Sequence, residues 1–164
     1  MMKNFAWTGK QIAVTGVVAA IYAVLTLALS PLSYGAVQIR LSEAMLVLFL
    51  LDRRFAPGLI LGCAIANLFS PLGLIDVVVG TGATALALWA MAHTKSAWLA
   101  LLWPAVTNGA LVGLELWVVD HLPFWFGFGT VALGELAAVL VVGGILYKWL
   151  VKSGVLKDWL AQRG

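Results

Sequence analysis

The sequence predicts an all-α integral membrane protein: one domain, residues 1–164, built as a bundle of six transmembrane helices with both termini in the cytoplasm. Its 164 residues are 63% hydrophobic and only 10% charged, whereas a soluble domain carries about 25% charged residues. Long stretches without any Asp, Glu, Lys or Arg separate the few charges. We therefore expect a lipid bilayer to surround most of the chain.

The helices follow from these stretches, because a helix needs about 20 mainly apolar residues to cross the hydrocarbon of a bilayer. Four charge-free segments can each hold such a span: 11–39, 55–75, 77–94 and 96–114. Two further apolar runs are less regular, a short one at 41–51 and a long one at 124–151 that contains Glu135. The predicted helices are 12–30, 41–52, 57–71, 75–93, 97–119 and 127–151.

The first of these helices is expected to be retained, although Lys3 and Lys10 precede it as basic residues precede the core of a signal peptide. Its apolar run is about 20 residues long, whereas that of a signal peptide is roughly 7 to 15, and five more spans follow. The single Cys63 lies inside the predicted helix 57–71. With no second cysteine, a disulfide framework within the chain is excluded.

The positions of Lys and Arg predict the orientation, because short cytoplasmic loops carry the excess of positive charge. In a six-helix bundle nine of the ten basic residues fall on one side, and Arg40 alone falls on the other. The nine are Lys3, Lys10, Arg53, Arg54, Lys95, Lys148, Lys152, Lys157 and Arg163. No basic run with interleaved aromatic residues occurs, which argues against nucleic acid as a partner. The tail 148–163 either lies on anionic headgroups as an amphipathic helix or forms a solvated end of the last helix.

The acidic residues have the opposite distribution. Four of them fall in the outer half of the predicted bundle: Glu43, Asp76, Glu115 and Glu135. An ionised side chain at the centre of a bilayer costs about 2.5 to 3.5 kcal/mol and usually faces the bundle interior or a water-filled cavity. Arg40 alone cannot neutralise four acids. A ligand that is cationic or rich in hydrogen-bond donors is therefore expected among them.

Two asparagines point to the same region. Asn67 lies near the outer end of its helix, and Asn108 lies seven residues before Glu115 and so on the same helical face. Taken singly, each amide is also explained as a hydrogen-bonding contact between helices. Taken with the acids, they predict a binding cavity. The segment 31–41 is the one longer loop on this side and is a candidate lid.

Small residues predict where helices pack closely. Gly58, Gly62 and Ala66 on one helix, and the run 80–84 on the next, are interpreted as packing faces within the bundle. The first helix carries two overlapping small-x-x-x-small patterns, formed by Gly16, Ala19, Ala20 and Ala23. Spacing alone leaves open whether that face packs internally or against a partner protein.

Several motifs occur together and in order: Pro31-Leu-Ser-Tyr-Gly35, Gln38-x-Arg40-x-x-Glu43, Asp76-x-x-x-Gly80-Thr81-x-x-Thr84 and Gly134-Glu135, with Asn67 and Asn108 between them. In this arrangement the chain resembles, over essentially its whole length, the queuosine-precursor transporter family. Its members are substrate-binding S components of energy-coupling-factor (ECF) transporters. Tyr34 departs from the pattern, where an aromatic such as Phe is expected, and its hydroxyl puts a detail of the substrate contact in doubt.

The resemblance implies a six-helix bundle of the ECF S-component type in the membrane of a bacterial cell. It implies as partners a transmembrane coupling protein and two ATPase subunits, the coupling protein being contacted through an Ala-x-x-x-Ala face that maps onto Ala19 and Ala23. The chain contains no phosphate-binding loop of the form G-x-x-x-x-G-K-[ST]. No cofactor is therefore expected in this chain, and the partners must hydrolyse the ATP.

The ligand that the resemblance implies is a 7-deazaguanine derivative. Its N–H groups suit carboxylate acceptors, its carbonyl suits Asn or Arg, and an aminomethyl group would add a cation. We expect Glu43 to contact this ligand and Arg40 to pair with Glu43, since residues i and i+3 can meet at a helix start. The alternative is a salt bridge that only holds the loop. Asp76, Glu115 and Glu135 are candidates for the remaining donors, and the candidates for stacking on the base are Tyr34, Phe69 and Trp117.

Other functions remain open at this point. The chain is also compatible with an S component for another vitamin-like or amino-acid ligand, and with a stand-alone proton-coupled carrier that uses Glu115 and Glu135 as relays. An intramembrane enzyme would need a nucleophile with a base, or a metal cluster. His93, His121 and Cys63 lie apart in the predicted topology. Neither enzymatic activity nor a metal site is expected.

Overall fold

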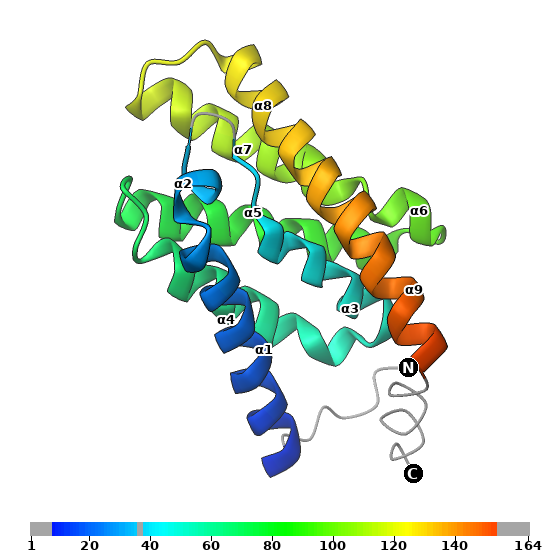
Figure 1. The fold of residues 1–164 in the computed structure, drawn as a ribbon. Coiled ribbons are helices and arrows are strands. Elements are labelled where there is room, and N and C mark those ends of the chain that lie inside the picture. Colours follow the sequence, from blue (N-terminus) through cyan, green and yellow to red (C-terminus); the bar gives the residue numbers. More distant parts are fainter. Residues whose placement is uncertain (1–7, 36–37, 154–164) are drawn as a thin grey trace.

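Every secondary-structure element is a helix in the computed structural model of the protein, which describes residues 8–35 and 38–153 (Figure 1). In chain order the elements are α1 (Gly9–Ala28), α2 (Ser30–Ser33), η1 (Leu41–Leu46), α3 (Val47–Leu51), η2 (Arg53–Phe55), α4 (Ala56–Asn67), α5 (Leu74–His93), α6 (Ala97–Ala100), α7 (Trp103–Val119), α8 (Phe124–Leu136), η3 (Ala137–Gly143) and α9 (Gly144–Ser153). The all-α class is therefore confirmed for this part of the chain. Residues 36 and 37 of the predicted lid, and 154–163 of the predicted tail, lie outside the described residues.

Four helical segments are long and apolar enough to cross a bilayer: Gly9–Ala28, Leu74–His93, Ala97–Val119 and Phe124–Ser153. The predicted helix 41–52 is present as the shorter apolar segment Leu41–Leu51. The predicted helix 57–71 ends early, at Asn67, because the chain then turns and leaves the turn through Gly73 with a φ of 66°. The count of six membrane crossings therefore stays a prediction.

The two ends of the described bundle lie together. In Figure 1 the first turn of α1 and the last turn of α9 lie at the lower end, while α2 and the connection between α7 and α8 lie at the upper end. This arrangement agrees with termini on one side of a membrane. Which side faces the cytoplasm stays a prediction from the positions of Lys and Arg.

Helices α1 and α4 approach closely because α4 presents glycine to α1. A Cβ atom added to Gly62 would lie 2.7 Å from Cβ of Tyr22 and 2.8 Å from the carbonyl oxygen of Ala19. A Cβ atom added to Gly58 would lie 3.0 Å from the carbonyl oxygen of Thr15. Real side chains do not tolerate contacts of this kind without a backbone shift. The interpretation of this glycine face as packing within the bundle is confirmed.

This contact corrects the prediction for Ala19 and Ala23. Both side chains are buried, at 2% and 6% exposure, and Ala19 lies directly against Gly62. They belong to the interface with α4 and present no open face to another protein. Gly16 and Ala20 of the same helix are exposed. The two overlapping patterns of small residues therefore lie on different faces of α1.

The last long helical segment, Phe124–Ser153, changes its geometry at η3, where the helix is of the π type. On one side of this change, a Cβ atom added to Gly134 of α8 would overlap the carbonyl oxygen of Gln38. At its other end, a Cβ atom on Gly143 would lie 3.0 Å from the carbonyl oxygen of Ala44. The same helix therefore packs tightly against both the segment that enters η1 and η1 itself.

Replacing Gly62 with alanine should destabilise the fold, because the added methyl group meets backbone atoms of α1 that cannot move aside independently. Overpacking of this kind costs typically about 1 to 3 kcal/mol. Thermal unfolding of the purified protein in detergent measures it. Gly82→Ala is the matched control, since nothing lies within 4 Å of its added Cβ atom, and it should leave the melting temperature unchanged or slightly raised. Equal melting temperatures for the two variants would contradict the close packing of α1 on α4.

Candidate functional site

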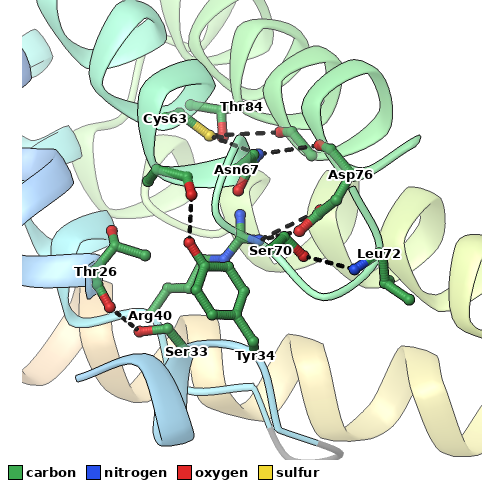
Figure 2. Close-up of polar contacts among 12 residues, drawn as sticks. Thr26, Ser33, Tyr34, Arg40, Cys63, Asn67, Ser70, Leu72, Asp76 and Thr84 are labelled. Atoms are coloured by element: carbon green, nitrogen blue, oxygen red, sulfur yellow. Dashed lines mark hydrogen bonds and ion pairs between the residues drawn. The ribbon is translucent and has the colours of Figure 1, made fainter. Parts of the chain in front are cut away.

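A buried ion pair links the segment before η1 to α5. The Nη2 atom of Arg40 lies 3.3 Å from Oδ2 and 3.4 Å from Oδ1 of Asp76, and both side chains are almost fully buried (Figure 2). The ion pair of Arg40 is therefore with Asp76 and not with Glu43, although Arg40 and Glu43 still interact electrostatically, as predicted. The rule that residues i and i+3 meet holds within a helix, but Arg40 has extended backbone angles and precedes the helix, so its side chain points elsewhere.

Glycine at position 80 makes room for this ion pair. A Cβ atom there would lie 2.7 Å from Nδ2 of Asn67, 2.8 Å from Oδ1 of Asp76 and 3.4 Å from Nη1 of Arg40. Asn67 also donates a hydrogen bond to the backbone carbonyl of Asp76 at 3.0 Å (Figure 2). Three polar side chains from three segments thus converge over the bare backbone of α5. The prediction that Asn67 and Asp76 lie in one polar cluster is confirmed.

Glu43 is fully buried and is held by α1 and α5. Its Oε1 atom accepts a hydrogen bond from the hydroxyl of Tyr22 and another, at 3.3 Å, from the hydroxyl of Thr84. Its Oε2 atom has no hydrogen-bond partner in the described part of the chain. The protein therefore fixes one oxygen of this carboxyl group and leaves the other available inside the bundle.

Three further polar side chains are buried without adequate partners. Both carboxylate oxygens of Glu115, both amide atoms of Asn108 and Oε2 of Glu135 have no hydrogen-bond partner among residues 8–35 and 38–153. Glu115 interacts electrostatically with Asp76 and Arg40, and Glu135 interacts with Glu43 and Arg40. Burying a polar group without a hydrogen bond is costly. A cluster of such groups is therefore typical of a site that a ligand completes.

The cluster has two levels along the bundle. Thr84 follows Asp76 by eight residues on α5, and Asn108 precedes Glu115 by seven residues on α7, so each pair is separated by roughly 10 to 12 Å at 1.5 Å per residue. We name the level nearer α2 the rim tier, which consists of Arg40, Asn67, Asp76 and Glu115. We name the other level the deep tier, which consists of Glu43, Thr84, Asn108 and Glu135.

A small pocket lies above the rim tier. Its volume is about 170 Å³, below the roughly 300 to 1,000 Å³ of common ligand pockets. The half-buried Tyr34 lines it, donates a hydrogen bond to the carbonyl of Ala66 at 2.6 Å, and has its ring centroid 5.7 Å from Cζ of Arg40. A ligand that enters here must therefore displace side chains at the rim. The other lining residues are Gly35, Gln38, Ser70, Pro71, Leu72, Leu116, Asp120 and Leu122.

A larger depression, of about 750 Å³, lies at the opposite end of the bundle near Asp52, Arg53 and Lys95. It contains none of the buried polar atoms that lack partners. Its volume comes from the open end of the helices, where side chains meet solvent or headgroups. We therefore place the candidate site in the two tiers and not in this depression.

Two of the residues predicted to stack on a base do not face the cluster. Trp117 is 52% exposed and Phe69 is 65% exposed on the outer surface of the bundle. Of the predicted aromatic residues, Tyr34 alone lies beside the polar cluster. Three contributors were not predicted as site residues: Tyr22 and Thr84, which hold Glu43, and Gly80, which makes room for the ion pair. Gly80 and Thr84 were interpreted only as part of the packing run 80–84. Tyr22 carried a signal, since it is the one aromatic residue between Gly9 and Ala28.

The comparisons with known proteins agree on one family. The family model described as QueT transporter matches residues 12–152. The curated protein "Queuosine precursor transporter QueT" of Lactococcus lactis subsp. cremoris (strain MG1363) is 29% identical over 155 residues, a match that covers 84% of this chain and 90% of that protein. No solved structure matches the chain.

Asp76→Asn should strongly destabilise the protein, because it leaves the buried guanidinium of Arg40 without its ionic partner. Breaking a buried ion pair from one side costs about 3 to 5 kcal/mol. Asp120→Asn removes an acid that is exposed near the same end of the bundle and should have little effect. Thermal unfolding of the purified variants measures both. The double variant Arg40→Gln/Asp76→Asn should recover part of the loss, and a double variant worse than the sum of its parts would contradict the pairing.

Proposed function

Because the chain belongs to the QueT transporter family, we propose that it binds a queuosine precursor of the 7-deazaguanine type outside the cell and is the S component of an ECF importer. In this proposal the chain sits in the plasma membrane of a bacterial cell, captures the precursor in its two polar tiers and delivers it when ATPase subunits act on a shared coupling protein. The name of the Lactococcus relative supports the substrate class.

One observation carries the proposal: buried acceptors without partners outnumber buried donors without partners in the cluster. The acceptors are Glu43 Oε2, Asn67 Oδ1, Asn108 Oδ1, both oxygens of Glu115 and Glu135 Oε2, and the donors are Arg40 Nε and Asn108 Nδ2. A 7-deazaguanine base supplies several N–H donors on one edge and a single carbonyl acceptor. Such a ligand is complementary to this inventory of free groups.

Glu115 is the residue best suited to accept hydrogen bonds from the N–H groups on one edge of the base. Both of its oxygens are free, so it can accept two parallel hydrogen bonds from a ring N–H and an exocyclic amino group. It lies in the rim tier, lines a separate pocket between α5 and α7, and is followed by Leu116, which lines the pocket beside Tyr34. The free Nε of Arg40 is then the donor available to the carbonyl of the base, while its Nη2 atom stays with Asp76.

The exposed face of α1 supports docking on a partner protein. Only 28% of the most apolar window of α1 is buried inside the bundle, less than in the three other long spans. Gly16 and Ala20 lie on this open side and are separated by one helical turn. Small residues at this spacing let a second helix approach closely. We assign the contact with the coupling protein to Gly16 and Ala20, in place of Ala19 and Ala23.

A stand-alone proton-coupled carrier is the second candidate function. The free carboxyl oxygens of Glu115 and Glu135 favour it, because buried acids in membrane bundles often relay protons. The two functions differ in what drives uptake. An S component needs its ATPase subunits, whereas a carrier transports in vesicles that contain this chain alone and a proton gradient.

Glu115→Gln should weaken binding of 7-deazaguanine precursors by roughly tenfold to a hundredfold, since a hydrogen bond to a charged group is worth about 1.5 to 3 kcal/mol. Calorimetry with the purified protein measures the affinity, and mass spectrometry of ligand that copurifies tests the substrate class. Trp117→Phe, on the outer surface of the same helix, is the control and should bind as the wild type does. Wild-type affinity in Glu115→Gln would remove Glu115 from the site, and no binding of any 7-deazaguanine would overturn the proposed function.

Ala20→Trp should abolish uptake in cells that hold the coupling protein and the ATPase subunits, while purified protein still binds ligand within a few-fold of wild type. The bulky ring would block the approach of a partner helix without entering the bundle. Val78→Trp, also on an exposed helical surface, should transport normally. Normal uptake by Ala20→Trp would show that this face is not the contact, and uptake without the ATPase subunits would favour the carrier.

A further inference from the structure

The charges of the cluster do not balance among the described residues. Glu43, Asp76, Glu115 and Glu135 are buried, and Arg40 is the one buried cation in residues 8–35 and 38–153. Arg40 is committed to Asp76 by its ion pair. The other three carboxyl groups interact with Arg40 only at longer range and share its single charge, and two of them, Glu43 and Glu135, lie in the deep tier.

The protein holds one oxygen of Glu43 and leaves the other available. Its Oε1 atom accepts hydrogen bonds from two hydroxyl groups, those of Tyr22 and Thr84. These two donors favour the ionised form and fix the plane of the group, whereas burial opposes ionisation. The same contacts leave Oε2 without a hydrogen-bond partner among the described residues. Glu43 is thus oriented to offer one acceptor, and a cation in the deep tier would favour its charged form.

Glu135, on α8, shares one feature with Glu43. Its Oε2 atom is also buried and free, and its carboxyl group interacts electrostatically with that of Glu43. Two like charges in a medium of low dielectric constant repel each other strongly, so one of the two carboxyl groups takes up a proton unless a cation lies between them. Because the ion pair of Arg40 is with Asp76, a cationic group of the ligand is the partner that would let both carboxylates be charged.

Asn108 supplies an independent observation. Its side chain is 1% exposed, and neither amide atom has a hydrogen-bond partner in the described part of the chain. It lies seven residues from Glu115 on α7, as Thr84 lies eight residues from Asp76 on α5, and helical spacing therefore assigns both to the deep tier. Its Oδ1 atom is a third free acceptor at this level. An ammonium group has three N–H donors and no acceptor. Glu43, Glu135 and Asn108 each provide one free oxygen, so the three oxygens match the three donors in number.

We propose that the deep tier is an ammonium site: Glu43 Oε2, Glu135 Oε2 and Asn108 Oδ1 bind the cationic amine of a 7-aminomethyl-7-deazaguanine, while the rim tier holds its base. This inference rests on the proposed function and narrows its substrate. A neutral nitrile at the same position of the base has an acceptor and no donor, so it leaves all three oxygens unpaired. The site therefore selects the aminomethyl precursor against the cyano precursor.

Tyr22 is a positioning residue in this arrangement. Its hydroxyl contacts Glu43 and does not itself reach a free group of the cluster. Tyr22→Phe removes one donor to Oε1 and keeps the ring and the Cβ atom that lies against Gly62. The substitution should therefore reduce the preference for the aminomethyl ligand and leave the affinity for the base itself largely unchanged.

The test compares three 7-deazaguanines that differ only at position 7, where they carry an aminomethyl, a methyl or a cyano group. Calorimetry on wild-type protein should show the aminomethyl ligand binding roughly tenfold to a hundredfold more tightly than the methyl ligand, the range expected for charge-assisted hydrogen bonds. Glu135→Gln should abolish this preference and leave the affinities for the methyl and cyano ligands within a few-fold of wild type. Tyr22→Phe should reduce the preference in the same direction.

Glu115→Gln is the matched control, because it removes an equally buried acid from the other tier. It should weaken the binding of all three ligands by a similar factor and retain the preference for the aminomethyl ligand. Glu135→Gln carries the test in case Glu43→Gln, which also loses the anchor to Tyr22, does not fold. Equal affinities of wild-type protein for the aminomethyl and methyl ligands would overturn the ammonium site and leave the proposed function standing. Failure of all three ligands to bind would overturn the proposed function itself.

Discussion

A charge buried inside a membrane protein is stabilised by other charged or polar groups, by a ligand or by water in a cavity, and in the present fold the ion pair between Arg40 and Asp76 is the central contact of this kind. It ties the segment before η1 to α5, and Asn67 ties α4 to the same point. The remaining buried acids interact with Arg40 only at longer range. Their free oxygens are therefore not filled by this cation, and they stay available to a ligand.

Glycine determines where helices come close enough to build this cluster. Gly62 lets α1 lie against α4, which brings the hydroxyl of Tyr22 to Glu43. Gly80 lets three polar side chains converge on the backbone of α5, and Gly134 lets α8 lie against Gln38. At each of these positions a methyl group would meet backbone or polar atoms. Selectivity for a small polar ligand therefore depends on residues that would never touch it.

The sequence was a good guide to where helices and acids lie, and a poor guide to which way side chains point. Charge-free stretches located the helical segments, and the scarcity of charge identified Asp76, Glu115 and Glu135 as unusual. In a helix that is apolar on all sides, however, no periodicity separates the lipid side from the interior, and for this reason Trp117 and Phe69 were placed wrongly. Ala19 and Ala20 are adjacent in the sequence and each belongs to one of the two small-residue patterns, so spacing could not tell which of them faces outward. Arg40 was misassigned because the rule used for it assumes a helical backbone.

The π-helical part of the segment Phe124–Ser153 has a consequence for helical phase. Gly134 and Gly143 are nine residues apart, about two and a half turns of an α-helix, which would place them on opposite sides. Yet both lie against one continuous stretch of chain, Gln38 in one case and Ala44 in the other. Hydrogen bonds from i to i+5 widen the turns of η3, so that the same nine residues complete fewer turns and the two glycines come into phase. The π-helical turns of η3 thereby change the rotation of α8 about the helix axis relative to the part of the helix after η3. This rotation determines how Glu135 is oriented toward the stretch of chain that carries Glu43.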